Sequence, residues 1–282
     1  MPNYDKLSLV VSLILLCLAL SLLVELPTRA LSFVALGLPL TIRLSQNWLV
    51  AALLAGMACS GTASVVRLHP LSRREKRTFV SCILPSLAVL LAAILLPRTP
   101  NRIYNLGGLA VMGILLPLII IAEYRIIDPA APDHRAIRLG LNFIAYLLAL
   151  VLFALIHDSK VDTSPEPCTE LCRSISTGFL SATAAMVGSS LLALDLLYGA
   201  QQSLRQTGLY ALIVGLVMGE IAWTLSYWQV NSLTAGILLL LIFYIVTGLA
   251  RQGLSGLLSR RILIEFALVA LIGLALLLKY GP

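Results

Sequence analysis

Glu220 is the residue of this chain best placed to carry chemistry, because its carboxyl lies inside a long apolar segment. An ionisable group at the centre of a membrane helix costs about 2.5–3.5 kcal/mol on insertion scales. Desolvation favours the neutral carboxyl, which can donate a hydrogen bond. We therefore expect the side chain to point into a helix bundle. Two interpretations stay open, a carboxylate that binds a proton or a cation and a structural hydrogen bond between helices.

Other polar side chains within apolar segments can support such a carboxyl. The candidate partners of Glu220 at similar depth are Tyr146, Tyr244 and Asn142, with Trp223 one helical turn along. Asp195 is a second intramembrane candidate, near one end of its segment and within reach of the interface or of an arginine in a neighbouring loop. A single carboxylate does not make a proton relay, so these residues are candidates for a site and not a predicted mechanism.

Cys168 and Cys172 share one polar gap, and two uses of their thiols are possible. A disulfide can form there if the gap faces an oxidising compartment, although a spacing of four residues suits a loop better than a helix. A metal site that adds His157 and Asp158 is the alternative, but nothing fixes the ligand spacing. The sequence has no phosphate-binding glycine loop, no His-Glu-x-x-His and no nucleophile elbow. We predict no catalytic residue, no metal and no cofactor.

Nine apolar segments, each long enough to cross a bilayer, hold these residues in place. Lipid forces such segments to satisfy their own backbone as helices. They are Leu7–Val24, Trp48–Val66, Thr78–Leu96, Leu106–Ala122, Leu139–Ile156, Ser176–Leu197, Leu209–Tyr227, Leu233–Leu249 and Ile262–Leu278. The first can be an uncleaved signal anchor or a cleavable signal peptide, and its length favours the anchor.

Composition and charge agree with this architecture. Hydrophobic residues make up 59% of the chain and charged residues 12%, with a mean hydropathy of +0.97, and these values exclude a soluble domain. If the N-terminus is inside, 13 of the 20 Lys and Arg residues face the cytoplasm. This excess follows the positive-inside rule, so the net charge of +7 reports topology and no nucleic-acid partner is expected. We predict a bacterial cytoplasmic membrane protein with its N-terminus inside and its C-terminus outside.

The two longest gaps are predicted to lie outside. Residues 158–174 are typical of a polar loop. Residues 31–46 predict a β-hairpin, because apolar and polar residues alternate in Leu40–Gln46 and turn residues separate it from Leu31–Leu36. An irregular interfacial loop is the alternative. The predicted fold is therefore an all-α polytopic membrane protein with about nine helices and a small external hairpin, in a single membrane domain over residues 1–282.

Small residues recur every four positions in three segments, a pattern that lets membrane helices approach closely. These stripes are Ala52, Gly56, Ser60 and Ser64, then Ser181, Ala185 and Ser189, and then Ala211, Gly215 and Gly219. We expect these three helices at the centre of the bundle. Pro85 and Pro117 are predicted to kink the third and fourth helices.

Several short motifs resemble an uncharacterised family of bacterial multi-pass membrane proteins. They are Leu26-Pro-Thr-Arg29, the stretch Leu36-Gly-Leu-Pro-Leu-Thr-Ile-Arg-Leu-Ser45 before a Trp-led segment, Ala122-Glu-Tyr-Arg125, Tyr227-Trp228 and Arg260-Arg261. The resemblance covers most of the chain and implies an integral membrane location. It implies no activity, and no catalytic or binding residue can be carried over.

Three function classes follow from these residues. The leading hypothesis is a non-enzymatic structural or assembly component of the membrane, in contact with the lipid bilayer and with a possible membrane-protein partner. The second is a small-solute or ion transporter that uses Glu220. The third is a membrane-embedded lipid-modifying enzyme with a polar site near Glu25, Arg29 and Arg43.

Overall fold

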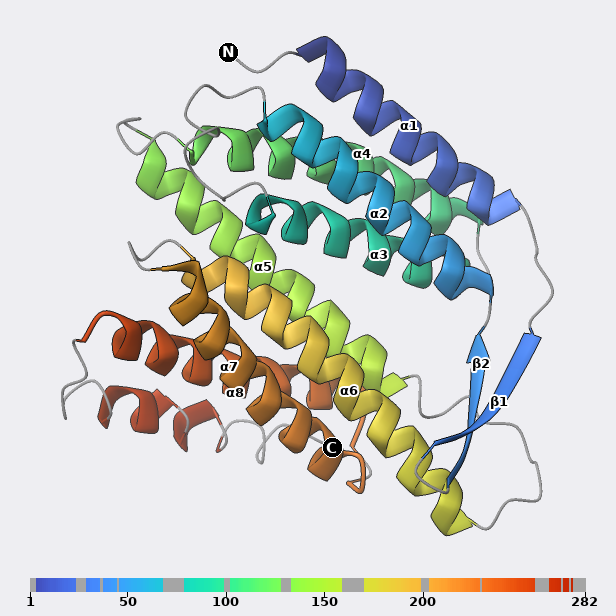
Figure 1. Ribbon diagram of the computed structural model, residues 1–282, viewed down its shortest axis with the longest axis vertical. Helices are drawn as coiled ribbons and strands as arrows, with labels where there is room; N and C mark the ends of the chain where they lie inside the picture. Colours follow the sequence, from blue (N-terminus) through green and yellow to red (C-terminus); the bar gives the residue numbers. More distant parts are fainter. Residues whose placement is uncertain are drawn as a thin grey trace. The chain divides into compact units, whose positions relative to one another are not determined.

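A computed structural model describes most of the chain as helices (Figure 1). The described residues are 4–23, 29–35, 38–44, 46–67, 79–98, 102–127, 133–158, 170–198, 203–228, 230–256, 264–269, 271–273 and 275. The chain divides into two compact units, Met1–Ile144 and Ala145–Pro282, and the boundary falls inside one helix.

The first unit contains four helices, the beginning of a fifth and a pair of strands. The helices are α1 (Tyr4–Leu23), α2 (Gln46–Val66), α3 (Ile83–Leu95), α4 (Arg102–Arg125) and α5 (His134–Asp158), of which α5 continues into the second unit. Short 3₁₀ turns, η2 (Val80–Cys82) and η3 (Leu96–Arg98), extend α3 at both ends. Helix α1 packs on α2 and α4 through Leu7, Val11, Ile14 and Leu18, which are all buried.

Helix α3 is the core of this unit. It is almost entirely apolar and packs against both α2 and α4, and ten of its residues are buried (Figure 1). A helix that is hydrophobic all round is one that other helices cover. Pro85 is the third residue of α3 and follows directly on the 3₁₀ turn η2, and the kink at Pro85 stays a prediction. Pro117 does lie inside α4, and the helix continues past it.

The small-residue stripe of α2 does not face the core, which corrects the prediction for this helix. Its four residues, Ala52, Gly56, Ser60 and Ser64, are all exposed. A Cβ added at Gly56 would meet nothing within 4 Å. The buried face of α2 instead carries Ala51, Leu54, Ala58, Thr62 and Val65. Its close approach to α1 is at Gly61, where an added Cβ would overlap the side chain of Val10.

Two strands lie between α1 and α2. Strand β1 (Arg29–Ala35) pairs antiparallel with β2 (Leu38–Leu44), and the register joins Leu31 to Ile42 and Phe33 to Leu40. We predicted strands over Leu31–Leu36 and Leu40–Gln46, so each observed strand is shifted by about two residues toward the N-terminus. Because β2 ends at Leu44, α2 can begin at Gln46, a residue that the prediction placed in the second strand. The side of the membrane on which these strands lie stays a prediction.

The second unit contains the rest of α5 together with α6 (Glu170–Leu197), α7 (Leu204–Leu225) and α8 (Ser232–Leu254). Helices α6 and α7 make the closest pair. A Cβ added at Gly215 would lie 2.5 Å from the carbonyl oxygen of Met186 and would overlap the hydroxyl of Ser190. An added Cβ at Gly219 would lie 3.1 Å from the carbonyl oxygen of Ala182. The stripe on α7 therefore packs against backbone, as predicted.

Seven of the described helices are long and apolar enough to cross a membrane. They are α1, α2 from Leu49, α4 from Ile103, α5, α6 from Gly178, α7 and α8. Two shorter apolar helices, Val80–Leu95 and Ile264–Gly273, lie within the remaining two predicted segments, Thr78–Leu96 and Ile262–Leu278. The architecture is that of a multi-pass membrane protein.

Candidate functional site

Helix α7 carries the candidate site, and two local features set its position. Ser203 caps its first turn, because the Ser203 hydroxyl accepts a hydrogen bond from the backbone N–H of Gln206 at 3.4 Å. Along the helix, one face carries Gly215, Met218 and Gly219 and is buried against α6. The opposite face is exposed, and it is the face that carries Glu220.

The exposed position of Glu220 corrects the prediction that its side chain points into the bundle. Its neighbours one turn away, Leu216 and Trp223, are also exposed. Within the described part of the chain, the Glu220 carboxyl has no hydrogen bond or ion pair, and the 3.0 Å bond from the Thr224 hydroxyl goes to the Glu220 backbone carbonyl. The prediction failed because Glu220 follows Gly219, and consecutive residues on a helix lie about 100° apart.

Glu220 is also nearer to a helix end than the sequence indicated. We placed it thirteenth in a helix over residues 208–228, but α7 runs from Leu204 to Leu225. Glu220 lies five positions before Leu225, the last residue of α7, which is a distance of about 8 Å at a rise of 1.5 Å per residue. The carboxyl therefore lies within the apolar part of the helix, between its middle and its C-terminal end.

Aromatic side chains surround this end of α7. The indole Nε1–H of Trp223 donates to the hydroxyl of Tyr227 at 3.1 Å. Phe179 of α6 packs edge-on against Trp223, with ring centroids 6.2 Å apart. Trp and Tyr concentrate at headgroup depth in membrane proteins. This pair therefore indicates that the membrane interface begins about one turn beyond Glu220.

The predicted tyrosine partners belong to a different cluster. The Tyr146 hydroxyl lies 3.4 Å from the hydroxyl of Thr247, and the Tyr146 ring packs against those of Phe243 and Tyr244 at 6.0 and 5.7 Å. Phe153 continues the cluster, 5.8 Å from Phe243. These contacts join α5 to α8 and form the apolar core of the second unit. They do not bring either tyrosine to Glu220.

Asn142 and Asp195 are each placed on their own helix. Asn142 is half-buried on the part of α5 that belongs to the first unit. Asp195 is half-buried two residues before the end of α6 and has an interaction partner of its own. Of the residues predicted to surround Glu220, only Trp223 lies on the same exposed face.

His157 and Asp158, the ligands of the alternative metal site, lie at the end of α5. The buried His157 uses its Nε2–H to donate to the carbonyl of Val230 at 2.9 Å, and the Ser232 hydroxyl donates to Asp158 at 3.4 Å. These bonds tie the end of α5 to the start of α8. Among the described residues, no group of three or more His, Cys, Asp or Glu could hold a metal ion. Of the proposed disulfide, Cys168 lies outside the described residues, and so does the side chain of Cys172, which is in the first turn of α6. Glu25 and the side chains of Arg29 and Arg43 are outside them as well.

Sequence reasoning missed one polar cluster in the first unit. Cys59 on α2 lies next to Cys82 on η2, and Glu123 of α4 and Arg67 are near Cys82. Cys82 and Glu123 are both buried. The sequence could have indicated this proximity. Consecutive membrane segments run antiparallel, so the end of Trp48–Val66 lies close to the start of Thr78–Leu96.

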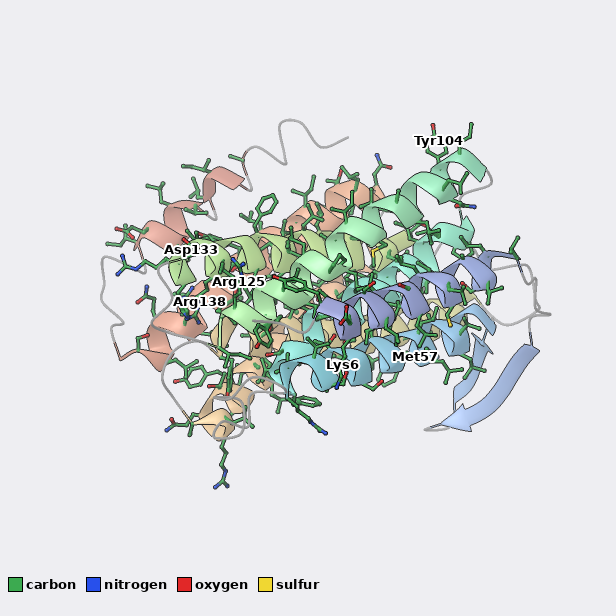
Figure 2. The ribbon with its side chains drawn as sticks, turned by 90° about the horizontal axis from the view of Figure 1, so that it is seen from above. Lys6, Met57, Tyr104, Arg125, Asp133 and Arg138 are labelled. Atoms are coloured by element: carbon green, nitrogen blue, oxygen red, sulfur yellow. The ribbon has the colours of Figure 1, made fainter. Side chains whose placement is uncertain are left out.

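Charged residues gather where α4 ends and α5 begins. Figure 2 shows Arg125, Asp133 and Arg138 at this end of the first unit, whereas Tyr104 lies at the other end of α4. Cations at one end and an exposed tyrosine at the other are typical of a membrane helix with one cytoplasmic end.

Comparison with known proteins identifies one match. The family described as a protein of unknown function (DUF5656) matches residues 26–279, which is most of the chain. No curated protein and no solved structure matches the chain. The predicted resemblance to an uncharacterised family is confirmed by this match.

Proposed function

Because the chain belongs to the DUF5656 family, whose function is unknown, we propose from its own geometry that it is a non-enzymatic structural or assembly component of the membrane. In this role the chain works through contact with another membrane protein. Apolar helices that cross the bilayer supply the scaffold, and an exposed helix face supplies the contact.

The observation that carries this proposal is the exposed position of Glu220. A carboxyl at lipid depth is costly unless a polar group meets it, and the described residues provide none. A neighbouring protein that brings a hydrogen-bonding group to the same depth would remove the cost. Polar side chains of this kind hold membrane helices together.

We also propose nine membrane crossings, with the N-terminus inside and the C-terminus outside a bacterial cytoplasmic membrane. Helix α3 supports the count despite its 13 residues, because the flanking 3₁₀ turns lengthen it. With rises of about 1.5 Å per α and 2.0 Å per 3₁₀ residue, the three pieces span about 30 Å. That length equals the hydrocarbon core of a bilayer. The short apolar helix Ile264–Gly273 would be the ninth crossing.

The transporter alternative depends on the same carboxyl. A transported proton or cation needs a water-accessible path to Glu220, and a side chain on the outer face of one helix is poorly placed for such a path. The alternative makes a different forecast for Glu220→Gln, which keeps a hydrogen-bonding side chain but cannot release a proton. Transport would be lost in that variant, whereas assembly would persist.

The test of the assembly role is the size of the complex that contains this chain in native membranes. We expect the chain, extracted in mild detergent, to migrate in a complex well above its own 30.4 kDa. Glu220→Leu should release it from that complex, whereas Glu220→Gln should not. A chain of unchanged size in all three cases, whether large or monomeric, would argue against a role for this residue in assembly.

A further inference from the structure

The exposed face of α7 has the spacing of a helix–helix seam. Six exposed residues recur at alternating intervals of four and three, and they define what we call the α7 seam: Leu209, Ile213, Leu216, Glu220, Trp223 and Tyr227. This interval is the heptad repeat of coiled coils, in which side chains at these positions pack against a partner helix. The apolar members are well exposed, at 58% for Leu209 and 50% for Ile213.

The α7 seam is distinct from the contact that α7 already makes. Gly215 and Gly219 lie on the other side of the helix and pack against α6. At the C-terminal end of the seam, Trp223 is held by the hydrogen bond to Tyr227 and by the edge contact with Phe179. The seam is therefore a pre-ordered surface, because one neighbour fixes the back of the helix and two aromatic contacts fix the end of the seam.

The membrane restricts how a second copy could meet this surface. Copies inserted with the same orientation are related by an axis along the membrane normal, so two α7 helices at a twofold interface run parallel. In a parallel, in-register pair each seam position faces the same position of the other copy. Glu220 would then face Glu220 of the second copy.

A carboxyl is complementary to itself when it is neutral. It offers one O–H donor and an acceptor oxygen, so two neutral carboxyls can satisfy each other at a twofold axis. A single polar position in an otherwise apolar seam fixes register and the number of helices. The hydrogen-bonding complementarity of Glu220 thus favours a second copy of this chain over an apolar partner.

We infer that the protein self-associates as a parallel twofold dimer through the α7 seam, with the Glu220 carboxyls of the two copies hydrogen-bonded to each other. This inference rests on the proposed assembly role and names the partner. It gives the Glu220 carboxyl a hydrogen-bonding partner that the described part of the single chain does not provide.

The test is disulfide cross-linking of the full chain, purified and reconstituted alone in phosphatidylcholine–phosphatidylglycerol vesicles at high lipid dilution. The five native cysteines are replaced, and one cysteine is introduced by Leu216→Cys in the seam. Ile237→Cys is the matched control, because Ile237 is also exposed but lies on α8. We expect a covalent dimer at position 216 and none at 237. Circular dichroism checks that each variant keeps its helix content.

Glu220 substitutions then test the acid pair. Dye-labelled wild-type protein, with its native cysteines, should show two photobleaching steps per vesicle cluster at dilutions where Glu220→Leu shows one. Interhelical polar contacts in membranes contribute about 0.6–1.7 kcal/mol, so the association constant should fall about 3- to 20-fold in Glu220→Leu and change little in Glu220→Gln. Thr224→Val serves as a control, since the Thr224 hydroxyl already bonds to its own helix.

Three results would overturn the inference. They are a monomeric wild-type chain in these vesicles, equal cross-linking at positions 216 and 237, and an association constant that Glu220→Leu leaves unchanged. If the purified chain is monomeric while the native-membrane complex still depends on Glu220, the partner is a different protein. In that case the inference fails and the proposed assembly role stands. If the purified chain is monomeric and the native-membrane complex does not depend on Glu220, the inference and the proposed assembly role both fail.

Discussion

Substitution of Gly215 by leucine is expected to separate α6 from α7 and to destabilise the protein more than any other single change considered. A side chain at this position would meet the backbone carbonyl of Met186, which cannot move without displacing α6. Overpacking of this kind costs about 1–3 kcal/mol and occasionally more. The measurement is the free energy of unfolding of the purified protein in mixed micelles, as the denaturing detergent fraction is raised.

Gly56 provides the matched control. It also lies within a membrane helix and in a stripe of small residues, but it is exposed and a Cβ there would meet nothing within 4 Å. We expect Gly56→Leu to leave stability unchanged or to raise it slightly, because glycine weakens a helix by about 0.5–1 kcal/mol relative to alanine. Equal destabilisation by the two substitutions would mean that the packing of α6 on α7 is not as described.

The second large effect is an all-or-none difference in labelling across the membrane. A single cysteine at Thr163 should react with an impermeant thiol reagent in intact cells, whereas one at Ser72 should react only after the membrane is opened. The physical reason is the charge split, since 13 of 20 Lys and Arg residues fall on the side predicted to be cytoplasmic.

The native cysteines must first be replaced in this experiment, because Cys168 and Cys172 share the gap of Thr163. Labelling after lysis controls for a cysteine that is buried and not merely on the far side. The reverse pattern, with Ser72 labelled from outside, would invert the proposed orientation. If both positions were labelled from the same side, the chain would cross the membrane an even number of times between them. That result would contradict the odd number of crossings predicted for this part of the chain.

The helices themselves were predictable from the sequence, for a simple reason. A long apolar segment in a bilayer can pair its own backbone N–H and C=O groups only as a helix. The predicted segments Leu209–Tyr227 and Leu233–Leu249 therefore overlap α7 and α8 closely. Their ends were less predictable, since the start of α7 depends on the Ser203 cap and the end of α3 on a 3₁₀ turn. Both are local hydrogen-bonding choices that hydropathy does not register.

Which face of a helix is covered was predicted less well. The stripes at Gly56 and Gly215 have the same pattern in the sequence, but only Gly215 packs against another helix. In lipid, apolar residues suit both the inside and the outside of a bundle, so amphipathicity cannot orient a helix as it does in water. The same ambiguity placed Glu220 on the wrong side of α7.

Contacts between distant segments were the least accessible from sequence. Tyr146 was expected near Glu220 because the two seemed to lie at one depth, but its ring packs against Phe243 and Tyr244. The proximity of Cys59 and Cys82 went unrecognised for the same reason. Depth can be read from position in a segment, whereas lateral neighbours depend on how the helices are arranged around one another.

The central claim is that the exposed face of α7 meets another protein and not lipid. A photoreactive amino acid at Leu216, compared with one at Ile237 on α8, tests this most directly in native membranes, because it reacts with whatever it touches. We expect a protein adduct at position 216 and only lipid adducts at position 237. Lipid adducts at both positions would contradict it.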